Sequence, residues 1–185
     1  MNNKLNMLEK IADEIRRCKL CQRWGEGKAV PGEGNPDAEI VFIGEAPGSE
    51  EAKTGRPFIG RSGRFLRQMI RSIGLKDEEV FITSPAQYRP VRGRPTKENI
   101  IHSRTHLLKQ LSIIDPKIIV LLGSTACLAL LERNVEISKE HGRTINKGDR
   151  VFFITFHPAY AMRFARKDFE EDFKRLKGLI GVIRG

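Results

Sequence analysis

This chain of 185 residues lacks several features that define whole classes of protein. No apolar run approaches the roughly 20 residues that span a bilayer, and the N-terminus opens an amphipathic pattern without a signal-peptide core. Three cysteines, an odd number, argue against a disulfide framework. The phosphate-binding patterns GxxxxGK(S/T) and GxGxxG are absent, which disfavours ATP- and NAD-dependent enzymes. We therefore expect a cytoplasmic protein with no membrane segment.

Positive charge, by contrast, is abundant. The chain has 33 Lys and Arg against 23 Asp and Glu, a formal net charge of +10, and a sequence pI of about 9.8. Such a surplus favours a polyanionic partner, most often nucleic acid, although a generally basic surface is the simpler alternative. The basic residues gather in residues 56–71, 89–94 and 163–167. This clustering favours contacts that follow a phosphate backbone.

The apolar pattern predicts strands that alternate with helices. We expect strands at residues 39–43, 80–83, 118–122 and 151–156, and helices at 4–17, 62–73, 124–132 and 167–181. A further helix is expected after its N-cap Thr96, with Leu107, Leu108 and Leu111 on its inner face. Residues 133–150 are polar and ambiguous. Alternation of this kind indicates one domain over residues 1–185, a three-layer α/β/α fold with a central, mainly parallel four-stranded sheet.

Two short loops follow strand-like runs and carry candidate chemistry. Residues 44–48 read Gly-Glu-Ala-Pro-Gly after the first strand, and residues 157–160 read His-Pro-Ala-Tyr after the last. Ligands of open α/β sheets bind outside the carboxyl ends of the strands. If the two strands are neighbours in one parallel sheet, the Glu45 carboxylate and the His157 imidazole converge on one crevice. Together they could position a water and stabilise a leaving anion.

Each of these residues also has a structural interpretation. A loop with Pro47 and Gly48 is an ordinary strand-to-helix turn, and a histidine at a strand end is often only a hydrogen-bonded residue of the fold. Phe58 is either a core residue or, among Gly, Pro and Arg, a stacking platform for a flat ligand. Cys127, in an apolar helical stretch, is expected to be a buried core thiol.

Seven short segments, each weak alone, occur in an order and spacing that together are specific. They are CKLC at 18–21, GEAPG at 44–48, TGRPFIG at 54–60, FIT at 81–83, RP at 89–90, LG at 122–123 and HPA at 157–159. The chain thereby resembles the uracil-DNA glycosylase superfamily over nearly its whole length. It is most similar to the family 4 enzymes of thermophilic bacteria and archaea.

The resemblance implies an enzyme that flips a base out of DNA, because the glycosidic bond is unreachable within the stack. It assigns Glu45 to the attacking water, Phe58 to stacking on the flipped base and His157 to a hydrogen bond with O2 of the departing uracil. Backbone groups of residues 44, 46 and 48 (Gly44, Ala46 and Gly48) would line the pocket.

The same resemblance assigns residues to the DNA itself. The loop after His157, with Tyr160, Met162 and Arg163, would enter the duplex where the base left. Ser62 and Arg89 would hold phosphates, which position DNA without reading its sequence. DNA is thus the expected partner, and the family suggests a monomer.

The chain departs from the family at the metal centre. Cys18 and Cys21 match the first two of four cysteine ligands to a 4Fe–4S cluster, but Tyr88 stands at the third position and Ser103 at the fourth. Two thiolates are too few for an ordinary cluster of this type. The family cluster is therefore expected to be absent or atypical.

Three alternatives follow for the remaining cysteine pair. The site holds no metal, or it holds an unusual cluster completed by Tyr88 or a histidine, or it holds zinc. For zinc, the Cys-x2-Cys pair and the His102-x3-His106 pair have ligand types and spacings that the ion accepts.

A second departure concerns the base. The family has an asparagine that pairs with the uracil edge, and this chain has Ser84 there. A hydroxyl cannot make the fixed two-point contact of an amide, and sites that lose such a partner lose selectivity. Ser84 therefore implies weaker uracil excision, a different deaminated base such as hypoxanthine or xanthine, or lost catalysis. A smaller departure is Ala52, where the family often has an acid.

Two functions compete on this evidence. The first is a monofunctional DNA repair glycosylase that hydrolyses the N-glycosidic bond of a deaminated base, most simply uracil, and leaves an abasic site. The second is a non-catalytic DNA-binding relative. A degenerate fold has no reason to keep Glu45 and His157 while it loses two cysteines, so their presence favours the enzyme.

Overall fold

The computed structural model describes residues 3–185. In this part of the chain, a six-stranded sheet has the order β2-β4-β3-β6-β8-β7. The strands are β2 (Glu33–Gly34), β4 (Val80–Thr83), β3 (Ile40–Ile43), β6 (Ile118–Leu122), β8 (Arg150–Thr155) and β7 (Thr144–Lys147). Neighbours among β4, β3, β6 and β8 are parallel, while β2 and β7 pair antiparallel at the two edges.

The four predicted strands therefore form the parallel centre, but the predicted number of strands was wrong. Both additional strands are polar and lie at edges. β2 has two residues within a loop rich in Gly and Pro, and β7 is mostly exposed and joins β8 through a turn at Gly148. Neither strand has an apolar run, because an edge strand with little burial needs none.

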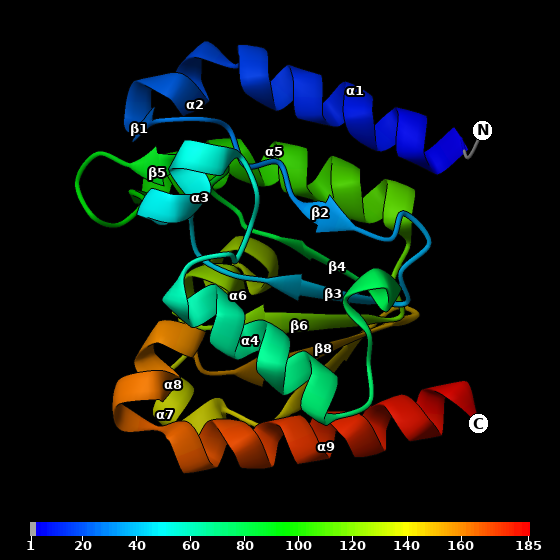
Figure 1. The fold of residues 1–185 in the computed structure, drawn as a ribbon. Coiled ribbons are helices and arrows are strands. Elements are labelled where there is room, and N and C mark those ends of the chain that lie inside the picture. The colour runs from blue at the N-terminus through cyan, green and yellow to red at the C-terminus, as the bar shows by residue number, and fades with distance from the viewer. Residues whose placement is uncertain (1–2) are drawn as a thin grey trace.

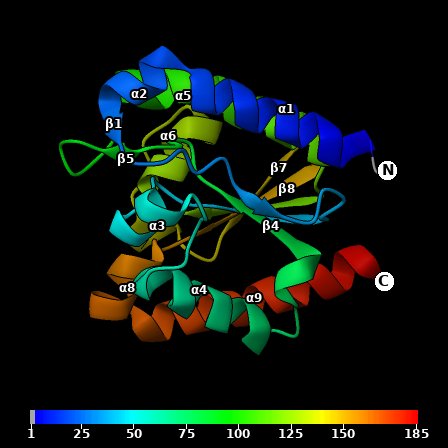
Figure 2. The ribbon, with the colours of Figure 1, turned by 45° about the horizontal axis from the view of Figure 1, so that its top comes forward.

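Helices cover both faces of the sheet and make three layers (Figures 1 and 2). The longer helices are α1 (Asn3–Arg17), α4 (Arg61–Ser72), α5 (Lys97–Ile114), α6 (Ser124–Leu131) and α9 (Arg166–Arg184). All five match predicted helices. Thr96 is the N-cap of α5, where its side chain accepts a hydrogen bond from the Asn99 N–H. Among residues 3–185, no helix is both long and apolar enough to cross a bilayer.

Alternation along the strands divides the core into two apolar clusters. In β3, Val41 and Ile43 face the side covered by α1, α5 and α6, while Ile40 and Phe42 face the side covered by α4 and α9. All four residues are buried, so β3 is covered on both faces of the sheet, as a central parallel strand is. Cys127 lies in the first cluster, fully buried, and burial raises its pKa to about 12. The prediction of a buried core thiol is confirmed.

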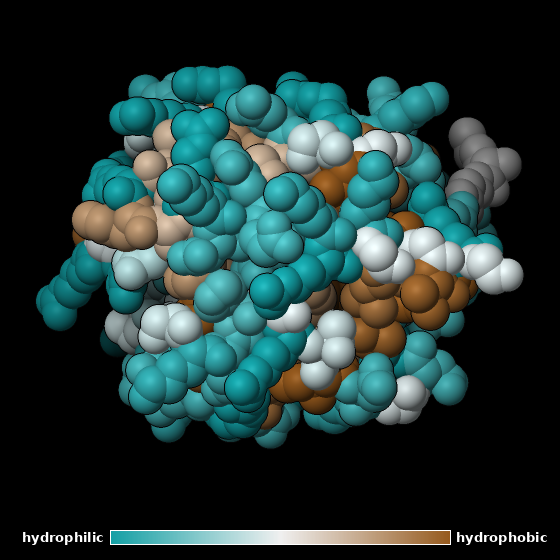
Figure 3. All heavy atoms as spheres, turned by 90° about the horizontal axis from the view of Figure 1, so that it is seen from below, coloured by the Kyte–Doolittle hydropathy of each residue, from teal (hydrophilic) through white to brown (hydrophobic). Residues whose placement is uncertain are grey.

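Shorter elements occupy the ends of the sheet. They are α2 (Lys19–Trp24), β1 (Gly25–Glu26), α3 (Ser49–Thr54), η1 (Asp77–Glu79), β5 (Arg89–Pro90), α7 (Ile137–Glu140) and α8 (Pro158–Phe164). β1 and β5 pair antiparallel as a separate two-stranded ribbon. Viewed from the side of α9, the surface is mostly hydrophilic, with apolar side chains showing in a few patches (Figure 3).

A buried hydrogen-bond network joins the last strand to the last helix. Asp172 of α9 is fully buried, and its carboxylate accepts hydrogen bonds from the Thr155 hydroxyl at 2.7 Å and from His141 Nδ1 at 3.0 Å. Burial raises the pKa of Asp172, and the two hydrogen bonds oppose that shift. The His141 ring packs 4.5 Å, centroid to centroid, from Phe156, which directly follows β8.

We expect Asp172→Ala to lower the free energy of unfolding by at least about 2 kcal/mol, because it leaves the buried Thr155 hydroxyl and the partly buried His141 ring without their partner. Urea unfolding followed by circular dichroism measures the change. Glu171→Ala is the matched control. Its side chain is exposed and pairs with the equally exposed Lys174, so the loss should stay within about 0.5 kcal/mol. Equal losses in the two variants would contradict this role for the network.

Candidate active site

The candidate site lies where the four parallel strands end. The segments that follow β3, β4, β6 and β8 begin at Gly44, Ser84, Gly123 and Phe156. The register aligns Ile43 with Thr83 and Leu121, and Leu122 with Thr155, so these segments meet at one edge. The strands β3 and β8 belong to one parallel sheet but are not direct neighbours, because β6 lies between them. The segment after β6 therefore contributes to the site as well.

Glu45 is held by that intervening segment. Its Oε2 accepts a hydrogen bond of 2.7 Å from the Thr125 hydroxyl, and its Oε1 lies 3.7 Å from Arg94 Nε. The Glu45 side chain is about one-fifth exposed (22%), whereas that of Arg94 is 81% exposed. The carboxylate is thus fixed on one side by a short hydrogen bond, and on the other side it lies beside an exposed cation. That leaves an oxygen available to a water.

His157 is the N-cap of α8. Its Nδ1 accepts a hydrogen bond of 3.2 Å from the Ala159 N–H, so in the neutral ring the proton is on Nε2. Burial lowers the pKa of His157 below 6.5; the charge of Glu45 opposes this shift and that of Arg94 adds to it. The ring is therefore neutral near pH 7 and presents a hydrogen-bond donor to the site. Sequence analysis placed this residue in a loop, and the helix that follows was not predicted.

A small cavity of about 140 Å³ lies on one side of the imidazole. Its lining comprises Val30, Ala46, Pro47, Gly48, Glu51, Pro57, Phe58, Ser62, Ser84 and His157. Predicted site residues Ala46, Gly48, Phe58 and Ser84 thus come together here with His157. The Phe58 ring centroid lies 6.4 Å from that of His157. An aromatic face, a hydroxyl and an imidazole donor around a small, partly open cavity suit a small planar polar ligand.

The position of Phe58 depends on two glycines. A Cβ on Gly44 would lie 2.3 Å from the Phe58 ring, and a Cβ on Gly63 would lie 2.1 Å from the Phe58 carbonyl carbon. Phe58 itself has a φ of 51°, in the left-handed region that non-glycine residues rarely adopt. The strain at Phe58 and the two close approaches indicate a functional constraint on the position of the ring. Gly44 lies against the ring and is not among the residues that line the small cavity, so its predicted part in the pocket stays a prediction.

A buried carboxylate holds the loop that carries Phe58. Glu51 accepts hydrogen bonds from the backbone N–H groups of Gly48, Ile59 and Gly60, at 3.1, 2.9 and 2.8 Å. It thereby joins the loop after β3 to the start of α4. Arg67 supports the same loop from below, because it donates to the carbonyl oxygens of Pro57 and Phe58.

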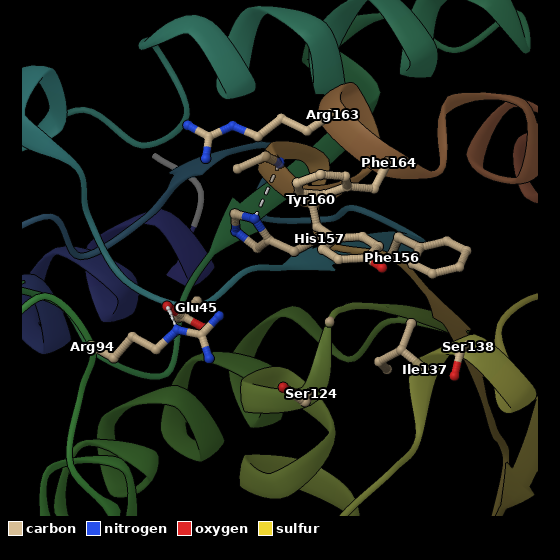
Figure 4. Close-up of a pocket in the computed structure, with 12 residues that line it drawn as sticks. Glu45, Arg94, Ser124, Ile137, Ser138, Phe156, His157, Tyr160, Arg163 and Phe164 are labelled. Atoms are coloured by element: carbon tan, nitrogen blue, oxygen red, sulfur yellow. Dashed lines mark hydrogen bonds and ion pairs between the residues drawn. The ribbon is translucent and has the colours of Figure 1, made fainter.

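A larger cavity of about 560 Å³ is also lined by His157 (Figure 4). Its lining includes Glu45, Arg94, Ser124, His157, Tyr160, Arg163 and Phe164. Tyr160 stacks on Phe156 at 5.6 Å with an interplanar angle of 11°, and Phe164 packs against Tyr160 at 5.2 Å. In Figure 4, Glu45 and Arg94 lie to one side of the imidazole, the aromatic rings to the other. Flat apolar faces and two guanidinium groups thus border one groove.

Two predicted phosphate contacts have different positions. Ser62, at the start of α4, lines the small cavity and a neighbouring hollow of about 480 Å³ that also contains Arg61, Arg64 and Arg163. Arg89 lies outside both cavities described above, on β5, and forms an ion pair of 2.7 Å with Glu26. Its assignment to a phosphate stays a prediction.

Sequence analysis missed Thr125 and Phe164, and it did not single out Arg94 from its basic loop. Thr125 follows a predicted strand end, and that position was the available signal. Cys18 and Cys21 lie apart from this edge, beside His102 and His106 of α5. The group Cys18, Cys21, His102 and His106 is the candidate metal site.

The lowered pKa of His157 predicts how stability depends on pH. The unfolded chain takes up a proton at this residue near pH 6.5, and the folded chain resists it until lower pH. The contribution of His157 is therefore complete above pH 6.5 and is lost as the pH falls below it. We expect the wild type to lose more free energy of unfolding between pH 7.5 and pH 5 than His157→Ala does. Urea titrations at both pH values measure this, and equal losses would refute it.

Comparison with known proteins identifies the family of this chain. The profile of the Uracil DNA glycosylase superfamily matches residues 31–177. A type-4 uracil-DNA glycosylase of Sulfurisphaera tokodaii is 42% identical, over 95% of this chain and 86% of its own length. Another, of Thermotoga maritima, is 36% identical over 97% and 98% of the two chains.

A solved structure shares the fold. The crystal structure of wild-type Pedobacter heparinus SMUG2 superposes with a TM-score of 0.59 over 96% of this chain and 98% of that one, at 14% identity. At this identity the similarity concerns the fold alone. The profile match and the two relatives show that this chain belongs to the uracil-DNA glycosylase superfamily and groups with its type-4 members.

Proposed function

We propose that the protein is a DNA repair glycosylase that hydrolyses the N-glycosidic bond of a flipped-out uracil and leaves an abasic site. The observation that carries the proposal is the position of His157, which forms a wall of the small cavity and also borders the groove that contains Glu45. A base in the small cavity and a water beside Glu45 would lie on opposite sides of the bond to be broken. The names of the type-4 relatives support the same activity.

The proposed chemistry assigns one task to each side chain. The Glu45 carboxylate, fixed by Thr125, accepts a hydrogen bond from the attacking water and lies close to the positive charge that develops on the sugar. The water oxygen bonds to C1′ and passes a proton to the Glu45 carboxylate, while the bond from C1′ to the base nitrogen breaks and the base departs as an anion with the electron pair. The neutral His157 donates from Nε2 to a base carbonyl, where negative charge accumulates.

Contacts with the rest of the DNA fit the groove. Arg94 and Arg163 border it, and both are exposed cations that can reach phosphates. Tyr160 and Phe164 present exposed rings beside them, at 50% and 72% exposure, on which neighbouring bases can stack. The sequence-based expectations of a monomer and of a cytoplasmic location stay predictions.

We expect Glu45→Gln and His157→Ala each to lower the rate of uracil excision at least tenfold, about 1.4 kcal/mol of transition-state stabilisation. A labelled oligonucleotide with a single uracil, cleaved by alkali after excision, measures the rate under single-turnover conditions. Glu39→Gln is the matched control. Glu45 lies in the segment after β3, whereas Glu39 directly precedes β3 at the opposite end and pairs with Lys117 and Arg184.

The control should retain its rate within about twofold, since Glu39 is distant from the site. DNA binding by all three variants is measured in parallel by fluorescence anisotropy. Binding without excision by the wild type would refute the glycosylase and leave a DNA-binding protein.

The identity of residue 84 is expected to set the selectivity of the site among deaminated bases. Ser84 is buried (6% exposed) and lines the small cavity beside Phe58. Ser84→Asn would supply an amide that both donates and accepts, so uracil excision should rise about tenfold over hypoxanthine excision. Ser84→Ala, which removes the hydroxyl, should lower it. Assays on uracil, hypoxanthine, xanthine and undamaged oligonucleotides measure the ratios. A hypoxanthine or xanthine preference in the wild type would overturn the assignment of uracil.

A further inference from the structure

Four ligand atoms from two distant segments converge beside α5. Cys18 is the N-cap of α2, Cys21 lies within that helix, and His102 and His106 lie one turn apart on α5. One sulfur or nitrogen of each lies within 4.8 Å of the others, and Cys18 Sγ is 3.1 Å from His102 Nε2. Some 80 residues separate the two pairs, so tertiary structure alone brings the four together.

The environment of His106 points to a missing ligand. The residue is 7% exposed, and both of its ring nitrogens are buried without a hydrogen-bond partner. An imidazole with two unsatisfied nitrogens is costly, since each buried polar atom without a partner costs about 1–3 kcal/mol. The Glu14 carboxylate lies 3.9 Å from Nδ1, beyond hydrogen-bond range but on the side where it could orient the ring.

The 4Fe–4S cluster that the family implies does not fit this donor set. Tyr88 is buried against Cys21, Ile11 and Ile15, and its hydroxyl donates to the carbonyl oxygen of Arg16. Ser103 is also buried and donates to Asn99 Oδ1 at 2.9 Å. Both positions are therefore occupied by neutral hydroxyl groups that already have partners.

The distances between the four donor atoms also favour a single metal ion over an iron–sulfur cluster. Zinc–sulfur bonds of about 2.3 Å and zinc–nitrogen bonds of about 2.0–2.1 Å place tetrahedral donors roughly 3.3–3.8 Å apart. The four atoms here lie within 4.8 Å of one another, so shifts within the reach of side-chain rotation complete a tetrahedron. In a two-iron centre with two cysteines and two histidines, bridging sulfides separate the thiolates from the imidazoles. Cys18 Sγ lies 3.1 Å from His102 Nε2, a separation close to that of two ligands of one ion and shorter than a bridged two-iron centre would give.

We propose that Cys18, Cys21, His102 and His106 bind one Zn²⁺ in a closed tetrahedral site that takes the place of the iron–sulfur cluster. Four protein ligands leave no open coordination position, so the ion is structural. It cross-links the junction of α1 and α2 to α5. A hollow of about 580 Å³, lined by Glu14, Cys18, His106 and others, gives the ion a path from solvent.

The first experiment measures metal content in tag-free protein from cells grown with both zinc and iron. Inductively coupled plasma mass spectrometry should find about one zinc per chain and little iron, and the protein should be colourless. Replacement by Co²⁺ should give the intense visible bands of a tetrahedral ion with thiolate ligands. Iron and sulfide with a visible spectrum, or a chain without metal, would overturn the proposal.

Variants then test the ligands one by one. His106→Ala and His102→Ala should lose most of the zinc and lower the melting temperature, and a chelator should lower that of the wild type. Cys127→Ser is the matched control, because Cys127 is a buried thiol outside the group, and its zinc content should not change. His106→Cys replaces one zinc-binding side chain by another and should retain the zinc. Zinc loss in His106→Ala would then reflect the missing ligand and not misfolding. Unchanged zinc in both alanine variants would place the ion elsewhere.

Discussion

The parallel register of β3, β4, β6 and β8 is the constraint from which the candidate site follows. Neighbouring strands in a parallel ladder are about 4.8 Å apart, and the paired residues show that all four end at nearly the same level. Each strand therefore delivers one polar segment to the same edge. No side chain has to reach far, which is why a carboxylate, a hydroxyl and an imidazole from residues 45, 84 and 157 border adjoining cavities.

The loop between β3 and α4 adds what the sheet alone cannot provide. A flat aromatic face must stand against the strand ends, and there is room for it because Gly44 and Gly63 have no Cβ that would collide with Phe58. Glu51 then holds the loop, since its three hydrogen bonds to backbone N–H groups fix the segment on either side of Phe58, whose φ is positive. The buried carboxylate is thus a positioning residue for the ring.

Sequence patterns predicted the parts of the fold that burial dictates. The central strands are apolar on both faces, so their bounds were predicted within one residue. Edge strands β2 and β7 and helix α8 were missed, because their stability depends on partners that the local pattern does not show. The same reasoning explains the site. Glu45 and His157 follow apolar strands and were found, whereas Thr125 is recognisable only once β6 is known to lie between them.

The metal group and the groove are linked through the chain itself. α2 runs directly into β1, β1 pairs with β5, and the Val91 N–H donates to the carbonyl oxygen of Trp24 at 3.2 Å. The basic loop that follows carries Arg94 to Glu45. With a zinc ion as proposed, α2 would be anchored to α5, and the start of this loop would be anchored with it. An exposed arginine on an otherwise open loop could then stay near the carboxylate without burial of its own. A zinc ion in place of the iron–sulfur cluster would in that case still support the groove, although two of the cysteine ligands are absent.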